Sequence, residues 1–284
     1  MKLIADSGST KTDWALVEHG ELLGKFHTQG INPFHQDDAA IESILREELL
    51  PQLPDADSQC FLFFYGSGLR DELRLKMRQI FEKVFSPSTS RFLFSASHFE
   101  NDLLGAARAL CGRQEGIACI LGTGANSCLY DGENIIQNTP PLGYVLGDEG
   151  SGAVLGKLFV NAIFKVPQFA ALRDAYLQDC GLTMPVIINK VYREPLANRF
   201  LASTSTFIHQ HLDFEPLRRL VVDNFRAFFL RNVLPYQCQD LPVHAVGSIA
   251  YYYQAELREA AEHEGFRLGN ILRSPMDGLL KFHQ

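Results

Sequence analysis

The sequence predicts an α/β protein made of two related halves, because one order of elements occurs twice along its 284 residues. In each half a strand, a turn of small residues, a second strand, a tight hairpin turn and a third strand follow one another, and the two copies begin roughly 115 residues apart. At about 150 residues per domain, a chain of this length is expected to form two domains. We therefore expect a boundary near 112–116, between a domain over 1–113 and a domain over 114–284.

The first half is expected to open with three strands and to continue with alternating helices and strands. Apolar alternation predicts strands over 2–5, 12–18 and 21–29, and His19-Gly20 forms the hairpin turn between the last two. The elements after them are a helix over 36–50, a buried strand over 60–65, a helix over 71–85, a strand over 91–94 and a helix that opens with the capping box Ser97 to Glu100.

The second half repeats the opening strands over 117–121, 127–130 and 134–137, with Asp131-Gly132 as the hairpin turn. A mainly helical insertion is predicted over about 153–236. The elements after it are a strand over 243–246, a helix that reaches His263, a strand over 266–271 and a final helix over 275–282. That final helix is a candidate to pack back on the first domain.

Composition argues against several classes of function. The 26 Lys and Arg against 33 Asp and Glu give a net charge of −7, so we expect no basic surface for nucleic acid. No apolar run approaches the roughly 18 residues of a membrane span, and the N-terminus lacks a secretory signal pattern, so we expect a cytoplasmic protein with no membrane partner. The six cysteines contain no C-x-x-C pair, which predicts reduced thiols rather than a zinc ribbon.

The turn from Asp6 to Thr12 carries small residues suited to an anion. Its sequence fits neither the Walker A pattern nor G-x-G-x-x-G, and it leads into a strand rather than a helix. At the tip of a hairpin, free backbone N–H groups and hydroxyls can surround a phosphate. The carboxylate of Asp6 would repel that anion unless a cation such as Mg²⁺ lay between them. The alternative is a plain hairpin turn that uses Asp and Ser as turn formers.

A second small-residue turn, Gly122 to Asn126, occupies the same place in the second half. The two hairpins are expected to face one another across a cleft and to hold one triphosphate. Gly247-Ser248, at a predicted strand-to-helix junction, would let a nucleotide base approach the backbone. The alternative is three unrelated turns.

Two acidic features are candidates for substrate chemistry. Because the capping box makes Ser97 the N-cap, Asp102 is expected in the second turn of its helix, where it either faces solvent or acts as a catalytic base. Gly147 to Gly152 places Asp148 and Glu149 before a helix. These carboxylates either complement the helix N-terminus or bind substrate hydroxyls.

The motifs occur together in a recognisable order: Asp6-x-Gly8-x-Thr10, Asn101-Asp102, Leu121-Gly122-Thr123-Gly124, Gly147-Asp148-Glu149-Gly150-Ser151 and Val246-Gly247-Ser248. Over nearly the whole chain they resemble the N-acetylglucosamine kinases of the BadF/BadG/BcrA/BcrD ATPase family, in the actin, Hsp70 and sugar-kinase superfamily. The resemblance implies two ribonuclease-H-like domains flanking an ATP cleft. It also implies ATP and Mg²⁺ as cofactors and transfer of phosphate to the 6-hydroxyl of an amino sugar.

The resemblance also implies roles for individual residues. Asp6 would organise Mg²⁺ and Asp102 would be the base that accepts the sugar's hydroxyl proton. The sugar would contact Asn32, Gly143 and Asp148 as well as Asp102. The residues implied to bind ATP are Gly8, Ser9, Thr10, Lys11, Thr12, Thr123, Gly124, Gly247 and Ser248. The sequence departs from the family next to Gly143, because Leu142 occupies the place of a Trp in vertebrate members. This difference bears on recognition of the N-acetyl group.

Two other functions are compatible with the motifs. An ATPase activator of a 2-hydroxyacyl-CoA dehydratase or benzoyl-CoA reductase would hold an iron–sulfur cluster between two subunits, and Cys119 and Cys128 are its candidate ligands. A sugar sensor would keep the fold and bind without turnover. A homodimer is a candidate assembly, because the Phe- and Leu-rich stretch over 214–234 would serve either as core or as a dimer face.

Overall fold

The computed structural model describes residues 1–8, 10–54 and 60–284, and they form two compact units. The first unit is Met1–Arg113 together with Pro275–Gln284, and the second is Gln114–Ser274. Each unit holds a five-stranded sheet, with the orders β3-β2-β1-β4-β5 and β10-β9-β6-β7-β8. In both sheets the first three strands of the unit are antiparallel and the other two are parallel to its first strand. The predicted α/β class and its repeated strand order are confirmed.

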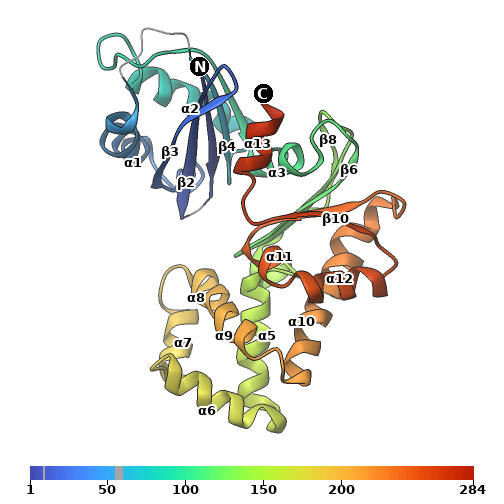
Figure 1. Cartoon of the computed structure of the whole chain (residues 1–284). Helices are drawn as coiled ribbons and strands as arrows, with labels where there is room; N and C mark the ends of the chain where they lie inside the picture. Colours follow the sequence, from blue (N-terminus) through green and yellow to red (C-terminus); the bar gives the residue numbers. More distant parts are fainter. Residues whose placement is uncertain (9, 55–59) are drawn as a thin grey trace. The chain divides into compact units, whose positions relative to one another are not determined.

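The sheet of the first unit is covered on both faces. Its strands are β1 (Lys2–Ser7), β2 (Lys11–Glu18), β3 (Glu21–Gln29), β4 (Cys60–Gly66) and β5 (Phe94–Asn101). One face, which includes Trp14, packs in a core with α1 (Asp38–Ser43), the π-helical turn Ile44–Leu49 and α2 (Asp71–Val84). On the other face Ile4 and Ala15 pack with residues of α3 (Asp102–Cys111) and α13 (Met276–Phe282). Figure 1 shows α13, in red, beside α3.

The segment 91–101 differs from the sequence prediction. The short strand expected over 91–94 and the helix expected to open at Ser97 are both wrong, because β5 runs to Asn101. Ser97 pairs with Leu62 of β4 in the parallel register, and Phe99 is buried in the core beside Phe64. Strand pairing and burial of Phe99 therefore outweigh the local capping signal, and α3 begins at Asp102 instead.

The second unit combines its sheet with a mainly helical insertion. The strands are β6 (Gly116–Leu121), β7 (Ala125–Tyr130), β8 (Ile135–Asn138), β9 (Val243–Val246) and β10 (Leu268–Leu272). The helices are α4 (Gly143–Leu146), α5 (Gly152–Lys165), α6 (Ala170–Asp179), α7 (Met184–Tyr192), α8 (Ala197–Ser203), α9 (Ser205–Gln210), α10 (Glu215–Phe228), α11 (Ser248–Tyr252) and α12 (Gln254–His263). Within the described ranges no single helix has the length and apolarity to cross a membrane, although α5 and the segment Pro167–Asp179 meet that test as one bent pair.

Aromatic residues of the stretch over 214–234 belong to the core of the second unit. Phe225, Phe228 and Phe229 are fully buried and pack with Phe159 of α5 and with the sheet. Of the two roles predicted for this stretch, its aromatic residues therefore serve as core. None of the six cysteines, all of which lie in the described residues, forms a disulfide, and Cys119 and Cys128 are fully buried within β6 and β7.

Replacing Gly156 with Ala is expected to destabilise the second unit by at least about 2 kcal/mol, because α5 and α8 touch there. A Cβ at Gly156 would overlap the backbone carbonyl of Leu201, which cannot rotate away as a side chain can. Thermal unfolding should show a Tm at least about 4 °C lower. The matched control is Asn161→Ala, an exposed position of the same helix, where Ala should be neutral or slightly stabilising. An unchanged Tm for the Gly156 variant would contradict the contact.

Candidate functional site

Three polar residues lie side by side across the first sheet, at the end of β1. Asp6 on β1 is directly opposite Asp13 on β2, and Asp13 is directly opposite His27 on β3. Residues opposite one another project from the same face, and Asp6 shares its face with Ile4, which packs near α3. The N-terminus of α3 supplies a further carboxylate, Asp102, to this region.

The environment of Asp6 and Asp102 moves both acids toward neutral pH. Burial raises the pKa of Asp6 to about 7, and the negative charges of Asp102 and Asp13 add to the shift. Burial also raises the pKa of Asp102 to about 6, against hydrogen bonds from backbone amides at the start of α3. Asn101 provides the N-cap by accepting a hydrogen bond from the Leu104 amide at 2.8 Å. Asp102 is thus the first helical residue, not a second-turn residue as predicted, and it need not cap the helix.

The first small-residue turn has an exposed tip and a buried base. The Gly8 amide donates to the carbonyl of Lys11 at 3.0 Å, and the Gly30 amide donates to the carbonyl of Thr10 at 3.1 Å. The side chains of Thr10 and Lys11 are exposed. Thr12 is fully buried, and its hydroxyl donates to the carbonyl of Gln29 at 3.1 Å. The hydroxyl of Thr12 therefore supports the turn, while Ser9, also predicted to bind ATP, lies outside the described residues.

Asn32 lies in a loop that the same turn holds in place. The fully buried hydroxyl of Ser7 contacts the hydroxyl of Thr12 at 2.7 Å and donates to the carbonyl of Ile31 at 2.9 Å. The Asn32 amide group donates to the hydroxyl of Ser67 at 3.3 Å. Ser67 directly follows Gly66, the partner of Asn101 in the sheet, so Asn32 is brought to the same end of the sheet as Asp102.

The loop after β4 requires glycine at position 68 for two reasons. Its backbone is left-handed, with φ +71°, and a Cβ there would overlap the side-chain amide of Asn32. Ser67 and Gly68 were not among the predicted site residues. Their signal in the sequence is the Gly66-Ser67-Gly68 break after an apolar strand, but contact with Asn32 joins loops 35 residues apart.

The second small-residue turn is held by the helix that follows the Gly147–Ser151 loop. The carbonyls of Gly122 and Thr123 accept hydrogen bonds from the first amides of α5, those of Gly152 at 2.8 Å and Ala153 at 3.1 Å. Gly247, with φ +126°, also lies against this turn, because a Cβ there would overlap the Leu121 carbonyl. Ser248 follows at the exposed start of α11. The structure therefore places Gly247 against the Leu121–Gly122 backbone, directly before Thr123 and Gly124.

Asp148 points its carboxylate at the same turn. Its Oδ2 atom lies 3.0 Å from the position of a Cβ on Gly124, so a side chain at residue 124 would press against this carboxylate. Burial raises the pKa of Asp148, while hydrogen bonds from the backbone of Gly143 and Ala125 lower it. The backbone at Asp148 is left-handed, with φ +57°, which is strained for a residue with a side chain. Gly143 and Asp148 are thus neighbours of Gly124.

The other residues of the Gly147–Ser151 loop hold the loop in place through hydrogen bonds within the second unit. Glu149 accepts hydrogen bonds from Arg231 at 2.8 Å and from Asn232 at 3.4 Å. The Gly150 amide donates to the side-chain carbonyl of Asn224 at 3.0 Å, and Ser151 caps α5. The sequence analysis missed Asn224 and Arg231, because residues more than 70 positions away leave no local signal for such contacts.

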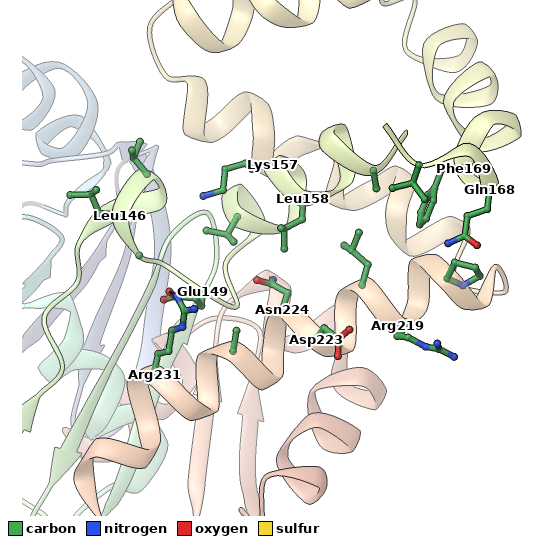
Figure 2. Close-up of a pocket in the computed structure, with 18 residues that line it drawn as sticks. Leu146, Glu149, Lys157, Leu158, Gln168, Phe169, Arg219, Asp223, Asn224 and Arg231 are labelled. Atoms are coloured by element: carbon green, nitrogen blue, oxygen red, sulfur yellow. Dashed lines mark hydrogen bonds and ion pairs between the residues drawn. The ribbon is translucent and has the colours of Figure 1, made fainter. Parts of the chain in front are cut away.

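A cavity of about 580 Å³ lies beside this loop in the second unit. Figure 2 shows Glu149 and Arg231 at one end of it and Gln168 and Phe169 at the other. Its lining includes Gly147 and Glu149 but not Asp148. The catalytic candidates of the sequence analysis therefore do not line this cavity.

The acidic residues at Asp6 fit a Mg²⁺ ion that is held mainly through water. In the described part of the chain, no group of three or more His, Cys, Asp or Glu could hold a metal ion by itself. Mg²⁺ keeps several water ligands and binds one or two carboxylates together with substrate phosphates. Asp6, Asp102 and Asp13 repel one another, and a bound divalent cation would reduce this repulsion.

Comparison with known proteins links this chain to sugar kinases. No family model matches, and no curated protein matches. A crystal structure described as that of a putative N-acetylglucosamine kinase from Porphyromonas gingivalis is 46% identical, with a TM-score of 0.93, over 100% of this chain and 98% of that one. A second one so described, from Chromobacterium violaceum, shares 20% identity and a TM-score of 0.73 over 100% and 98%.

A ROK family glucokinase from Streptomyces griseus, solved with glucose and AMPPNP, shares the fold with a TM-score of 0.58 at 14% identity, over 99% of this chain and 97% of that one. The fold is therefore that of the wider sugar-kinase group. By its identity to the Porphyromonas protein over the full length, the chain belongs to the N-acetylglucosamine kinase family.

Proposed function

We propose that the protein transfers the γ-phosphoryl group of ATP to the 6-hydroxyl of an amino sugar, with N-acetylglucosamine as the preferred substrate. The observation that carries the proposal is Asp102, a half-buried carboxylate that directly follows β5 and whose pKa is raised to about 6. A base with a pKa just below neutral is ionised at pH 7 and still accepts a proton effectively. Membership of the kinase family supports the reaction class.

In this reaction Asp102 accepts the proton of the sugar hydroxyl. The hydroxyl oxygen then forms a bond to the γ-phosphorus, the bond from that phosphorus to the β,γ-bridging oxygen breaks, and ADP leaves with the bond's electron pair. Asp6 would hold Mg²⁺ through water, and the ion would supply positive charge to the phosphates. Such a transfer depends mainly on positioning and charge neutralisation, so the protein needs few reacting groups.

The nucleotide is proposed to bind to both small-residue turns. Gly8, Thr10 and Lys11 form an exposed tip that offers the Thr10 hydroxyl and the Lys11 ammonium group. Thr123 and Gly124 would receive the phosphates in the second unit, and Gly247 with Ser248 would lie near the adenosine. The contact of Gly247 with the Leu121–Gly122 backbone supports this grouping.

Asn32, Gly143 and Asp148 are the proposed sugar contacts. Asn32 is supported by its place beside Ser67, at the sheet end that also holds Asp102. Asp148 accepts hydrogen bonds from two backbone amides and keeps further lone pairs for a sugar hydroxyl. Its contact with Gly124 would join the sugar to the phosphate turn.

A coupled assay of ADP release tests this function. N-acetylglucosamine, glucosamine, N-acetylmannosamine and glucose are compared with Mg²⁺ and ATP at pH 7.5, and phosphorus NMR of the product identifies the phosphorylated hydroxyl. We expect the highest kcat/KM with N-acetylglucosamine and a 6-phosphate product. ADP release that no sugar stimulates, or a product phosphorylated elsewhere, would contradict the proposal.

A further inference from the structure

We propose that Asp13 is a positioning residue that holds the ammonium group of Lys11 for the outer phosphates of ATP. The inference rests on the proposed function, because it assumes that the first turn binds those phosphates. It assigns a role to a residue that neither the motifs nor the proposed reaction uses.

A carboxylate at position 13 lowers the stability of the fold through its repulsion of Asp6. It stands directly opposite Asp6 in the antiparallel pair β1–β2, and like charges at such positions repel one another. The side chain of Asp13 is only 14% exposed, so water screens the repulsion poorly. A neutral side chain at this position would avoid the repulsion.

Lys11 and His27 both contact the carboxylate of Asp13. The Lys11 ammonium lies 2.8 Å from Oδ2 and 3.0 Å from Oδ1, so it contacts both carboxylate oxygens. On the other side Nδ1 of His27 lies 2.6 Å from Oδ1. Lys11 and Asp13 are two positions apart on one strand, so they project from the same face. The carboxylate is therefore bracketed by Lys11 and His27.

The contact with Asp13 restricts the side chain of Lys11, which directly follows Thr10 of the turn. Its side chain is 64% exposed, and an exposed lysine without a partner samples many rotamers. Contact with both oxygens of Asp13 restricts this freedom. The positive charge also acts on Asp6, so Lys11 is held within electrostatic range of the carboxylate near the end of β1. A restrained ammonium beside the turn costs less entropy when it binds a phosphate.

The positioning role and simple charge repulsion predict opposite changes in ATP affinity when Asp13 is neutralised. Asp13→Asn removes a negative charge beside the phosphates, so a purely repulsive Asp13 would lead to tighter ATP binding in this variant. If Asp13 instead holds Lys11, the variant loses the restraint, and the KM for ATP rises by about 3–10-fold. Binding of AMP, which lacks the outer phosphates, should not change in either case.

The experiment is a double-mutant cycle with Asp13→Asn, Lys11→Met and both together. Titration calorimetry with Mg·ATP and with AMP is combined with steady-state KM and kcat. In the Lys11→Met background we expect Asp13→Asn to have no weakening effect, because the group it would position is gone. Asp13→Glu should recover part of the ATP affinity. Thermal melts should show all variants folded, since Asn replaces Asp13 without a change in size.

The matched control is the ion pair of Lys25 on β3 with Asp277 on α13, at 3.0 Å. Lys25→Met and Asp277→Asn should leave the KM for ATP unchanged. Unchanged or tighter ATP binding by the Asp13 variant overturns the inference, as does an equal loss with and without Lys11. Those results leave the proposed function intact if wild type binds ATP and phosphorylates a sugar, whereas wild type without ATP binding overturns both.

Discussion

Replacing Asp102 with Asn is expected to lower kcat by at least about 100-fold, because the variant has no group to accept the sugar's proton. The amide has nearly the shape of the carboxylate, so the site should remain open to both substrates. ATP binding measured by calorimetry should therefore stay within about twofold of wild type, whereas removal of a binding residue would weaken it.

The structure makes this variant a clean test. The N-cap of α3 is Asn101, whose side chain bonds the Leu104 amide, so the substitution does not remove the cap. Asp71 is the matched control, since it is also the first residue of a helix, α2, but its side chain is 89% exposed. Asp71→Asn should keep full activity. Near-normal turnover by the Asp102 variant would remove this residue from the role of base.

The pH dependence of wild type follows from the same carboxyl group. Because burial raises the pKa of Asp102 to about 6, the ionised base is lost as the pH falls through that value. At saturating Mg²⁺, which would keep Asp6 ionised, the kcat/KM should therefore decline below about pH 6, approaching tenfold per pH unit. The residual rate of Asp102→Asn should lack this decline.

Replacing Asp6 with Asn is expected to make the protein more stable at pH 8 while it abolishes most activity. The pKa of Asp6 is about 7 in the folded chain against an ordinary value of 3.8, and burial is the main cause. Below about pH 4 the carboxyl is neutral in both the folded and the unfolded chain, so its ionisation does not reduce the free energy of unfolding. As the pH rises to 7 the unfolded chain loses the proton first, so the folded state loses stability.

The gain should amount to about 2–4 kcal/mol at pH 8 and vanish near pH 4, because each pKa unit of difference corresponds to about 1.4 kcal/mol. Thermal unfolding at the two pH values measures it. Asp131→Ala is a control of opposite sign, because backbone hydrogen bonds from Asn134 and Glu133 lower the pKa of Asp131. That variant should lose stability at pH 8 but not below the folded pKa. A stability change for Asp6→Asn that is equal at both pH values would contradict the burial of its charge.

Local chemistry was sufficient to predict the parts of this protein that repeat. The hairpin turns at His19-Gly20 and Asp131-Gly132, with alternating apolar residues on either side, gave the antiparallel strands of both sheets nearly to the residue. These signals are short-range, since turn type and strand alternation depend on neighbours in the chain. The small residues at Gly8 and Gly124 likewise indicated the turns between the first two strands of each sheet.

Other features depended on partners far away in the sequence. Sequence alone determined the two strand-turn-strand motifs and the candidate acids Asp6 and Asp102. Tertiary structure decided that Ser97 lies in a strand rather than at a helix cap, because pairing with β4 and burial of Phe99 outweigh one capping interaction. It also decided that Asp13 faces Asp6, because only the register of β1 against β2 sets which side chains meet.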